Sequence, residues 1–174
     1  MKNKKLFHLV FILLSMIMMT SCHTGPQIIL PQDWRTPLIG EIGNDWREKD
    51  ASRFLSITGD FNGDGNSDQA NILVREDKEK IGLFVFLKSK KGYKIYTLSE
   101  MDFLYTGEAG ITLIPPGKYV TWCGMGAIDC GLINEPEEID LRYDSINLFF
   151  EGKGSQYYYY DKSSDTFKRV AISD

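Results

Sequence analysis

One loop of the chain, between Gly59 and Asp68, carries oxygen-bearing side chains at a spacing that suits metal binding. Calcium takes about six to eight oxygen ligands at roughly 2.3 to 2.6 Å, and side chains at alternate loop positions can converge on one centre. Side-chain oxygens stand at positions 1, 3, 5 and 9 of this loop, which are Asp60, Asn62, Asp64 and Asp68. Asn66, at position 7, can add its backbone carbonyl. The pattern predicts a structural Ca²⁺ site at this aspartate loop.

Two further features of the aspartate loop support that prediction. Gly63 and Gly65 can adopt the positive φ angles of a tight turn. Without a cation, three carboxylates held this close would repel one another. The alternative is a turn that binds no metal, since Asp, Asn and Gly favour turns for their own conformational reasons.

The residues after the loop show which kind of calcium motif this is. An EF-hand needs a bidentate Glu at position 12 and a following helix, but position 12 is Asn71 and residues 69–74 alternate like a strand. The string GDFNGDGNSDQA resembles the calcium loop of FG-GAP or VCBS-type repeats, the blades of integrin-like propellers, over Phe54 to Leu98. The resemblance implies the metal role alone, because a single copy cannot close a propeller.

Histidine is absent from the chain after His23, and His8 is the only other one. This excludes Ser-His-Asp and Cys-His catalysis, and zinc hydrolase motifs built on histidine. The enzyme class that survives is a carboxylate-dependent glycan hydrolase. Its candidate residues, Glu135, Glu137 and Glu138, cluster around Pro136 in an expected solvated turn. We therefore expect a protein that is not an enzyme.

The N-terminal residues 1–21 have the order of a secretory signal peptide: a basic start, an apolar stretch and small residues before Cys22. The ending Met19-Thr20-Ser21-Cys22 resembles the lipobox of bacterial lipoproteins, which implies cleavage before Cys22 and its lipidation. An ordinary signal peptide is the alternative. His23 stands where that family would carry an Asp for inner-membrane retention, so the resemblance implies an exported, lipid-anchored protein at the outer membrane. Residues 22–33 read as a tether.

The two remaining cysteines, Cys123 and Cys130, form an even pair, which in an exported protein predicts a disulfide. A redox motif has two residues between its cysteines rather than six, and a zinc site needs further ligands. The glycine-rich loop between them would then be rigid.

Composition restricts the protein to an ordinary globular class. The chain has 174 residues, 43% of them hydrophobic and 25% charged, which fits one domain over residues 34–174. Its net charge of −4 and the lack of a basic run argue against nucleic acid as a partner.

Short apolar or alternating runs separated by turn residues predict a mainly β fold: one antiparallel domain, built as a meander, curled sheet or sandwich, with at most one or two short helices. A short helix is expected near Asp45 to Asp50. The expected strands are Phe54–Thr58, Gln69–Arg75, Gly82–Lys88, Tyr93–Leu98, Ile111–Ile114, Ile139–Arg142, Ile146–Phe150, Gln156–Tyr160 and Phe167–Ile172.

Four consecutive tyrosines, Tyr157, Tyr158, Tyr159 and Tyr160, should alternate between the two faces of a strand. Outward rings could contact a glycan or protein partner, although the sequence favours ordinary cross-strand aromatic packing over that role. We expect a lipid-anchored, calcium-binding β domain that acts by surface recognition or as a structural envelope lipoprotein. The alternative is an inhibitor or immunity protein against an exported lytic enzyme, with Ile128 and Asp129 on the inserting loop.

Overall fold

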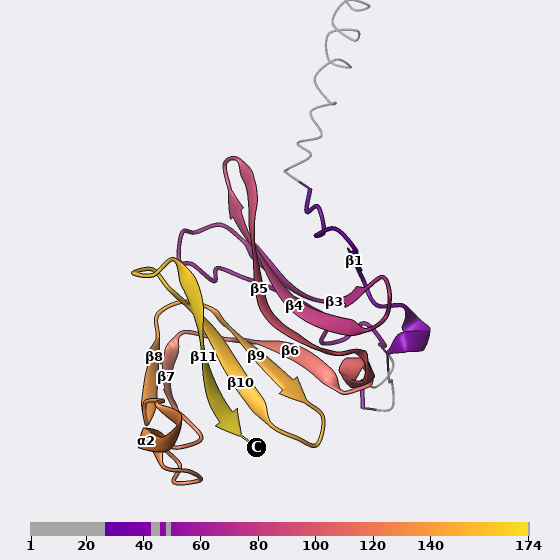
Figure 1. The fold of residues 1–174 in the computed structure, drawn as a ribbon. Helices are drawn as coiled ribbons and strands as arrows, with labels where there is room; N and C mark the ends of the chain where they lie inside the picture. Colours follow the sequence, from indigo (N-terminus) through magenta and orange to yellow (C-terminus); the bar gives the residue numbers. More distant parts are fainter. Residues whose placement is uncertain (1–26, 43–45, 48–49, 174) are drawn as a thin grey trace, which may run out of the picture.

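Two antiparallel sheets packed face to face form the body of the protein in the computed structural model, which describes residues 27–42, 46–47 and 50–173 (Figure 1). In the first sheet, β3 (Asp68–Arg75), β4 (Lys80–Ser89) and β5 (Gly92–Asp102) form a meander. The short strands β1 (Trp34–Arg35) and β2 (Ser56–Gly59) pair with different parts of the free edge of β3.

The second sheet has the order β11-β10-β9-β6, with β6 (Ala109–Ile114), β9 (Ser145–Phe150), β10 (Ser155–Asp161) and β11 (Thr166–Ser173). A separate hairpin of β7 (Gly117–Val120) and β8 (Glu138–Leu141) covers the outer face of this sheet. The remaining elements are two 3-10 helices, η2 (Ile39–Glu41) and η3 (Phe103–Gly107), and the single helical turn α2 (Cys130–Ile133).

The main core lies between the two sheets. Ile72, Val74 and Leu83 of the first sheet meet Ile111 and Leu148 of the second, and each is at most 1% exposed. Strand β4 is apolar on both faces because its other side carries Phe84 and Phe86, which form a second cluster. The mainly β, single-domain fold class predicted from the sequence is confirmed.

The outer face of the first sheet is covered by the N-terminal segment of the described chain. Ile28, Leu30 and Trp34 pack on Leu73 and Phe84, with the Trp34 and Phe84 rings 4.7 Å apart. The packed part of the described chain therefore includes Ile28 and Leu30, which precede the expected boundary at residue 34.

The expected strands all form, with ends shifted by a few residues. The first expected strand starts later than predicted: Phe54 has a φ of 69°, which is not an extended conformation, and β2 begins only at Ser56. The sequence did not predict β1 or β7, which are short and lie next to prolines or glycines. Of the helix expected near residues 45–50, Trp46 and Arg47 lie in a bend, and positions 45, 48 and 49 are outside the described residues.

The disulfide between Cys123 and Cys130 is confirmed, with Cα atoms 5.0 Å apart. It joins the segment after β7 to the first residue of α2. Among the residues that the structure describes, no helix is long and apolar enough to cross a lipid bilayer.

A nearly buried ion pair fixes η2 to the sheet and makes the stability depend on pH. Arg35 donates two hydrogen bonds to the carboxylate of Glu41, at 2.7 and 2.8 Å, and Lys78 lies 3.1 Å from it. The hydrogen bonds from Arg35 outweigh burial and, with the Leu38 N–H and Lys78, lower the pKa of Glu41 to about 2.

We expect Glu41→Gln to cost about 1 to 2 kcal/mol of unfolding free energy at pH 6. Because the folded pKa lies below the unfolded value of about 4.3, the contribution of the Glu41 charge is complete above that value and is lost as the pH falls towards 2. Urea unfolding at pH 6 and at pH 2.5 measures this difference. An equal gap between the two proteins at both pH values would contradict the assignment.

Candidate functional site

The aspartate loop links β2 to β3 and is organised by its own side chains. The Asp60 carboxylate accepts hydrogen bonds from the backbone N–H groups of Asp64 and Gly65, at 3.0 and 2.9 Å. The side-chain oxygen of Asn62 accepts a second bond from Asp64 N–H at 3.1 Å. Gly63 and Gly65 have φ angles of 66° and 83°, as the turn requires. These bonds gather three of the expected ligands in one turn.

Asp68 has a different task from the other loop carboxylates. It is 1% exposed and accepts hydrogen bonds from the N–H groups of Phe61, at 3.1 Å, and Lys88, at 2.7 Å. Burial raises the pKa of Asp68 to about 6; the two N–H groups oppose this, and the charges of Asp64 and Asp60 add to it. Asp68 thus ties the loop to the end of β4.

The donor chemistry of the loop fits a hard cation at Asp60, Asn62 and Asp64. Both Asp60 oxygens and Asp64 Oδ2 each accept one N–H and keep a lone pair for a metal, whereas Asp64 Oδ1 already accepts two, from the backbone and side-chain amides of Asn66. The N–H of Asn66 and the side-chain amides of Asn62 and Asn66 overcome the effect of burial and lower the pKa of Asp64. No group of three or more His, Cys, Asp or Glu side chains stands at metal-binding distances in the described ranges. The fit therefore depends on amide and backbone oxygens as well as carboxylates.

The loop is docked against the corner between β8 and β9. Asp60 N–H donates to the Asp144 carboxylate at 3.0 Å, and Lys162 Nζ donates to the Gly63 carbonyl at 3.3 Å. Lys162 Nζ also lies 4.5 Å from the ring centre of Tyr143. A Cβ atom on Gly63 would come within 2.1 Å of the Tyr143 ring, so only glycine allows this approach.

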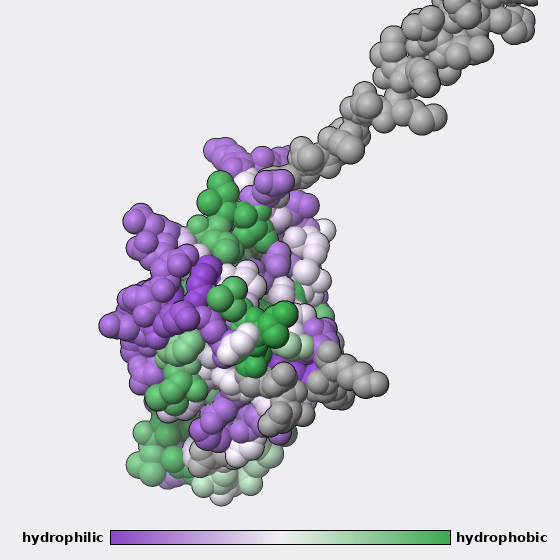
Figure 2. Space-filling view, turned by 90° about the vertical axis from the view of Figure 1, so that its right-hand side faces the viewer, coloured by the Kyte–Doolittle hydropathy of each residue, from purple (hydrophilic) through white to green (hydrophobic). Residues whose placement is uncertain are grey.

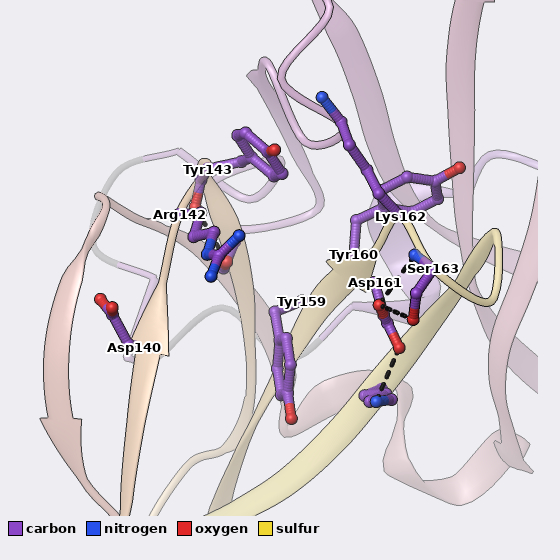
Figure 3. Close-up of a pocket in the computed structure, with 10 residues that line it drawn as sticks. Asp140, Arg142, Tyr143, Tyr159, Tyr160, Asp161, Lys162 and Ser163 are labelled. Carbon is purple, nitrogen blue, oxygen red and sulfur yellow. Dashed lines mark hydrogen bonds and ion pairs between the residues drawn. The ribbon is translucent and has the colours of Figure 1, made fainter.

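Tyr143 and Lys162 are also lining residues of a cleft of about 550 Å³ (Figure 3). The cleft lies where the end of β8 meets the outer face of the second sheet. Its lining residues come from β8, the β8–β9 corner, the start of β9, β10, the β10–β11 turn and β11: Asp140, Arg142, Tyr143, Ser145, Tyr159, Tyr160, Asp161, Lys162, Ser163 and Lys168.

The cleft holds both paired and unpaired charges. Asp161 accepts hydrogen bonds from Ser163 at 2.7 and 3.0 Å and lies 2.6 Å from Lys168 Nζ. The hydrogen bonds from Lys168 and then from Ser163 hold the pKa of Asp161 far below its usual value. Arg142 and Asp140 are exposed, and their side chains have no hydrogen-bond or ion-pair partner within the described part of the chain. Their polar groups are available to a ligand.

The four tyrosines of β10 divide between two environments. Tyr158, 5% exposed, and Tyr160 face the main core. Tyr157 and Tyr159 face the β7–β8 hairpin, where Tyr157 packs on Tyr119 with ring centres 5.5 Å apart. The hairpin therefore covers most of the surface expected for outward rings, and the described cleft retains Tyr159 as a partly exposed ring.

The other candidate residues lie outside the cleft. Glu135 accepts a hydrogen bond from Ala171 N–H at 2.9 Å, and Glu138 lies 3.3 Å from Lys118 Nζ. Glu137, exposed, provides its backbone carbonyl to Thr121. Asp129 caps α2 by accepting from Gly131 N–H at 2.8 Å, and the neighbouring Ile128 is partly buried. These residues do not form a carboxylate pair around a common cavity.

Sequence reasoning missed Arg142, Tyr143 and Lys162. Each stands next to a strand end or in a turn, where no periodicity or motif marks it. Gly63 and Lys162 are 99 positions apart, and their contact arises from the packing of two sheets. Gly63 was the one sequence feature that pointed to this contact, because a glycine can mark a close approach. Nothing in the neighbouring sequence shows that an aromatic ring packs against it.

Comparison with known proteins finds no matching family model, no matching curated protein and no matching solved structure.

Proposed function

We propose that this protein is an exported, lipid-anchored recognition domain that binds a saccharide in the cleft and holds calcium at the adjacent aspartate loop. The observation that carries the proposal is the shared wall: Tyr143 and Lys162 contact Gly63 of the loop and also line the cleft. An ion that fixes the loop would therefore also fix one side of the cleft.

The chemistry of the cleft favours a polyhydroxylated ligand. Arg142 and Lys162 offer hydrogen-bond donors, and the Asp140 carboxylate and the Ser163 hydroxyl oxygen offer acceptors. Tyr159 adds a ring that is partly exposed and amphipathic. Drug-like apolar ligands need a mainly hydrophobic lining, which this cleft lacks. A sugar combines hydroxyl groups with apolar C–H faces, and these match the charged groups and the tyrosine ring of the cleft.

Recognition fits the cleft better than hydrolysis does. Glycosidases use two carboxyl groups, one of which acts as an acid with a raised pKa. The pKa of Asp161 is lowered instead, because Lys168 and Ser163 stabilise its charged form. This carboxyl group would not carry a proton near neutral pH.

The anchor and the location rest on the N-terminal sequence. Residues 1–21 and Cys22 have the pattern of a lipoprotein signal and its acylation site, outside the described residues. Two or more acyl chains would give stable attachment, since each buried methylene contributes about 0.8 kcal/mol. We place the domain in the cell envelope, at the outer membrane.

Binding to an array of immobilised saccharides in millimolar calcium tests the proposed ligand class. We expect the wild type to bind one group of sugars and Arg142→Ala to lose at least tenfold in affinity, because this exposed side chain is free to pair with the ligand. Arg169→Ala is the matched control: Arg169 is an exposed arginine on β11 outside the cleft lining. Equal binding by all three proteins, or none, would refute the cleft assignment.

A second candidate function is inhibition of a cationic lytic enzyme by the disulfide lobe, residues 121–138. The lobe has four carboxylates and no lysine or arginine. Met125 and Leu132 are 59% and 78% exposed, each two residues beyond a cysteine of the disulfide. An acidic, rigid lobe with exposed apolar side chains complements a basic surface with an apolar pocket.

Turnover of a cell-wall substrate by a cationic lysozyme, with and without the protein, tests this second function. Inhibition by the wild type should weaken at least tenfold in Leu132→Asp, which places a charge in the apolar contact. Leu104→Asp serves as the control because Leu104 is 68% exposed but lies on η3. Unaffected lysozyme activity would remove this candidate.

A further inference from the structure

The first residues of the described chain and the regions of the two 3-10 helices carry exposed apolar side chains. Ile29, Leu38, Ile39 and Leu104 are 81%, 58%, 75% and 68% exposed, and we call them the anchor face. Figure 2 looks onto the side that carries η2 and shows hydrophobic areas there, one of them directly below the grey N-terminal segment.

The structure holds these side chains outward. Ile28 and Leu30 pack on the sheet while Ile29, between them, points away. Glu41 accepts from Leu38 N–H at 2.9 Å and is bound by Arg35, so η2 is fixed with Leu38 and Ile39 exposed. The hydrogen bonds of the nearly buried Glu41 carboxylate thus hold the Leu38 and Ile39 side chains in contact with solvent.

Two contacts bring η2 and η3 to the same end of the first sheet. Lys78 in the β3–β4 turn lies 3.1 Å from Glu41 of η2. The carbonyl of Glu79 in the same turn accepts a hydrogen bond from Phe103 N–H at the start of η3, at 3.0 Å. Leu38, Ile39 and Leu104 therefore flank one turn.

The short connection to Cys22 identifies what lies near Ile29, the first residue of the anchor face. Four residues separate Cys22 from Gln27, the first described residue. At no more than about 3.6 Å per residue, Ile29 cannot lie more than about 25 Å from a lipid-bearing Cys22. An apolar surface held this near to a bilayer gains free energy by entering its interface.

We propose that the anchor face lies in the surface of the lipid bilayer and orients the whole domain. This inference rests on the proposed acylation of Cys22. The cations near η2, Arg35 and Lys78, are already paired with Glu41, so the contact depends on apolar burial more than on lipid charge. The β10–β11 turn, which contributes Lys162 and Ser163 to the cleft, lies on the side opposite η2 in Figure 1. The cleft then faces away from the membrane, open to its ligand.

Depth-dependent fluorescence quenching of the full lipidated protein tests this orientation. Ile39→Cys and Leu132→Cys each receive a thiol-reactive fluorophore; the two positions are 75% and 78% exposed, so both variants should fold alike. The protein is placed in vesicles of phosphatidylethanolamine and phosphatidylglycerol that carry lipid-attached nitroxide quenchers. We expect quenching at Ile39→Cys to exceed that at Leu132→Cys at least threefold. Adding Leu38→Glu should reduce it severalfold.

Mass spectrometry of the N-terminal peptide separates failure of the anchor from failure of the orientation. If Cys22 is acylated but the two labels are quenched equally, the orientation is wrong and the anchor stands. If Cys22 carries no lipid, the proposed anchor is wrong. The membrane contact of the anchor face is then tested by measuring the same ratio of quenching at Ile39→Cys and Leu132→Cys with an excess of vesicles. A ratio near one in that experiment also overturns the proposal.

Discussion

Replacing Arg47 by methionine should destabilise the protein by about 3 kcal/mol or more, the largest effect we expect from one side chain. Arg47 is fully buried between the edges of the two sheets, and burial lowers its pKa. It donates to the backbone carbonyls of Arg53 at 3.1 Å, Gly107 at 3.1 Å and Ala109 at 2.5 Å. The Gly107 carbonyl keeps a bond from Trp46, but the other two lose their Arg47 donor.

Arg47 links the segment before β2 to η3 and β6. Phe54 provides its carbonyl to Ile111 N–H of β6 at 2.8 Å, beside the Arg47 contacts. The guanidinium also lies 4.0 Å from the ring centre of Trp46.

Urea unfolding of Arg47→Met, compared with that of Arg169→Met, measures the effect on stability. Because the Arg169 side chain is 60% exposed, the control should lose less than about 0.5 kcal/mol. Similar losses in the two variants would contradict a special role for Arg47.

Calcium should raise the thermal unfolding midpoint of the protein by about 5 to 10 °C when present at about 100 times its Kd. An ion that binds the folded loop and not the unfolded chain contributes about 2.7 kcal/mol at that concentration. Asp64→Ala should remove the shift, because Asp64 stands at the centre of the ligand set and is exposed. The variant should therefore fold normally without calcium.

The control for calcium is Asp140→Ala, which removes an exposed carboxylate outside the loop. It should keep the full calcium shift. Scanning calorimetry of the three proteins, in millimolar calcium and in chelator, gives the comparison. A wild type indifferent to calcium would show that the aspartate loop is only a turn.

The fold and parts of the site followed from local sequence patterns. Alternation and turn residues predicted the long strands, and the even pair of Cys123 and Cys130 in a chain with an export signal predicted the disulfide. The glycines at 63 and 65 have the expected positive φ. These features depend on a residue's near neighbours in the chain, which is why one sequence suffices.

Other features depend on long-range packing and were not predicted. Asp68 has its oxygens turned to Phe61 and Lys88 because β4 lies beside β3. The hairpin that covers Tyr157 includes β7, whose glycine-bordered sequence gave no strand signal. Arg47 was overlooked because a charged residue is seldom fully buried, and its carbonyl partners, up to 62 positions away, become neighbours only after folding.

Isothermal titration of the tightest-binding array saccharide tests most directly whether the cleft and the aspartate loop form one site. The sugar is titrated into the wild type in calcium, into the wild type in chelator, and into Arg142→Ala in calcium. We predict micromolar binding in the first case and at least tenfold weaker binding in the other two, because the loop supports Tyr143 and Lys162 while Arg142 contacts the ligand. One and the same affinity in all three titrations would contradict the account.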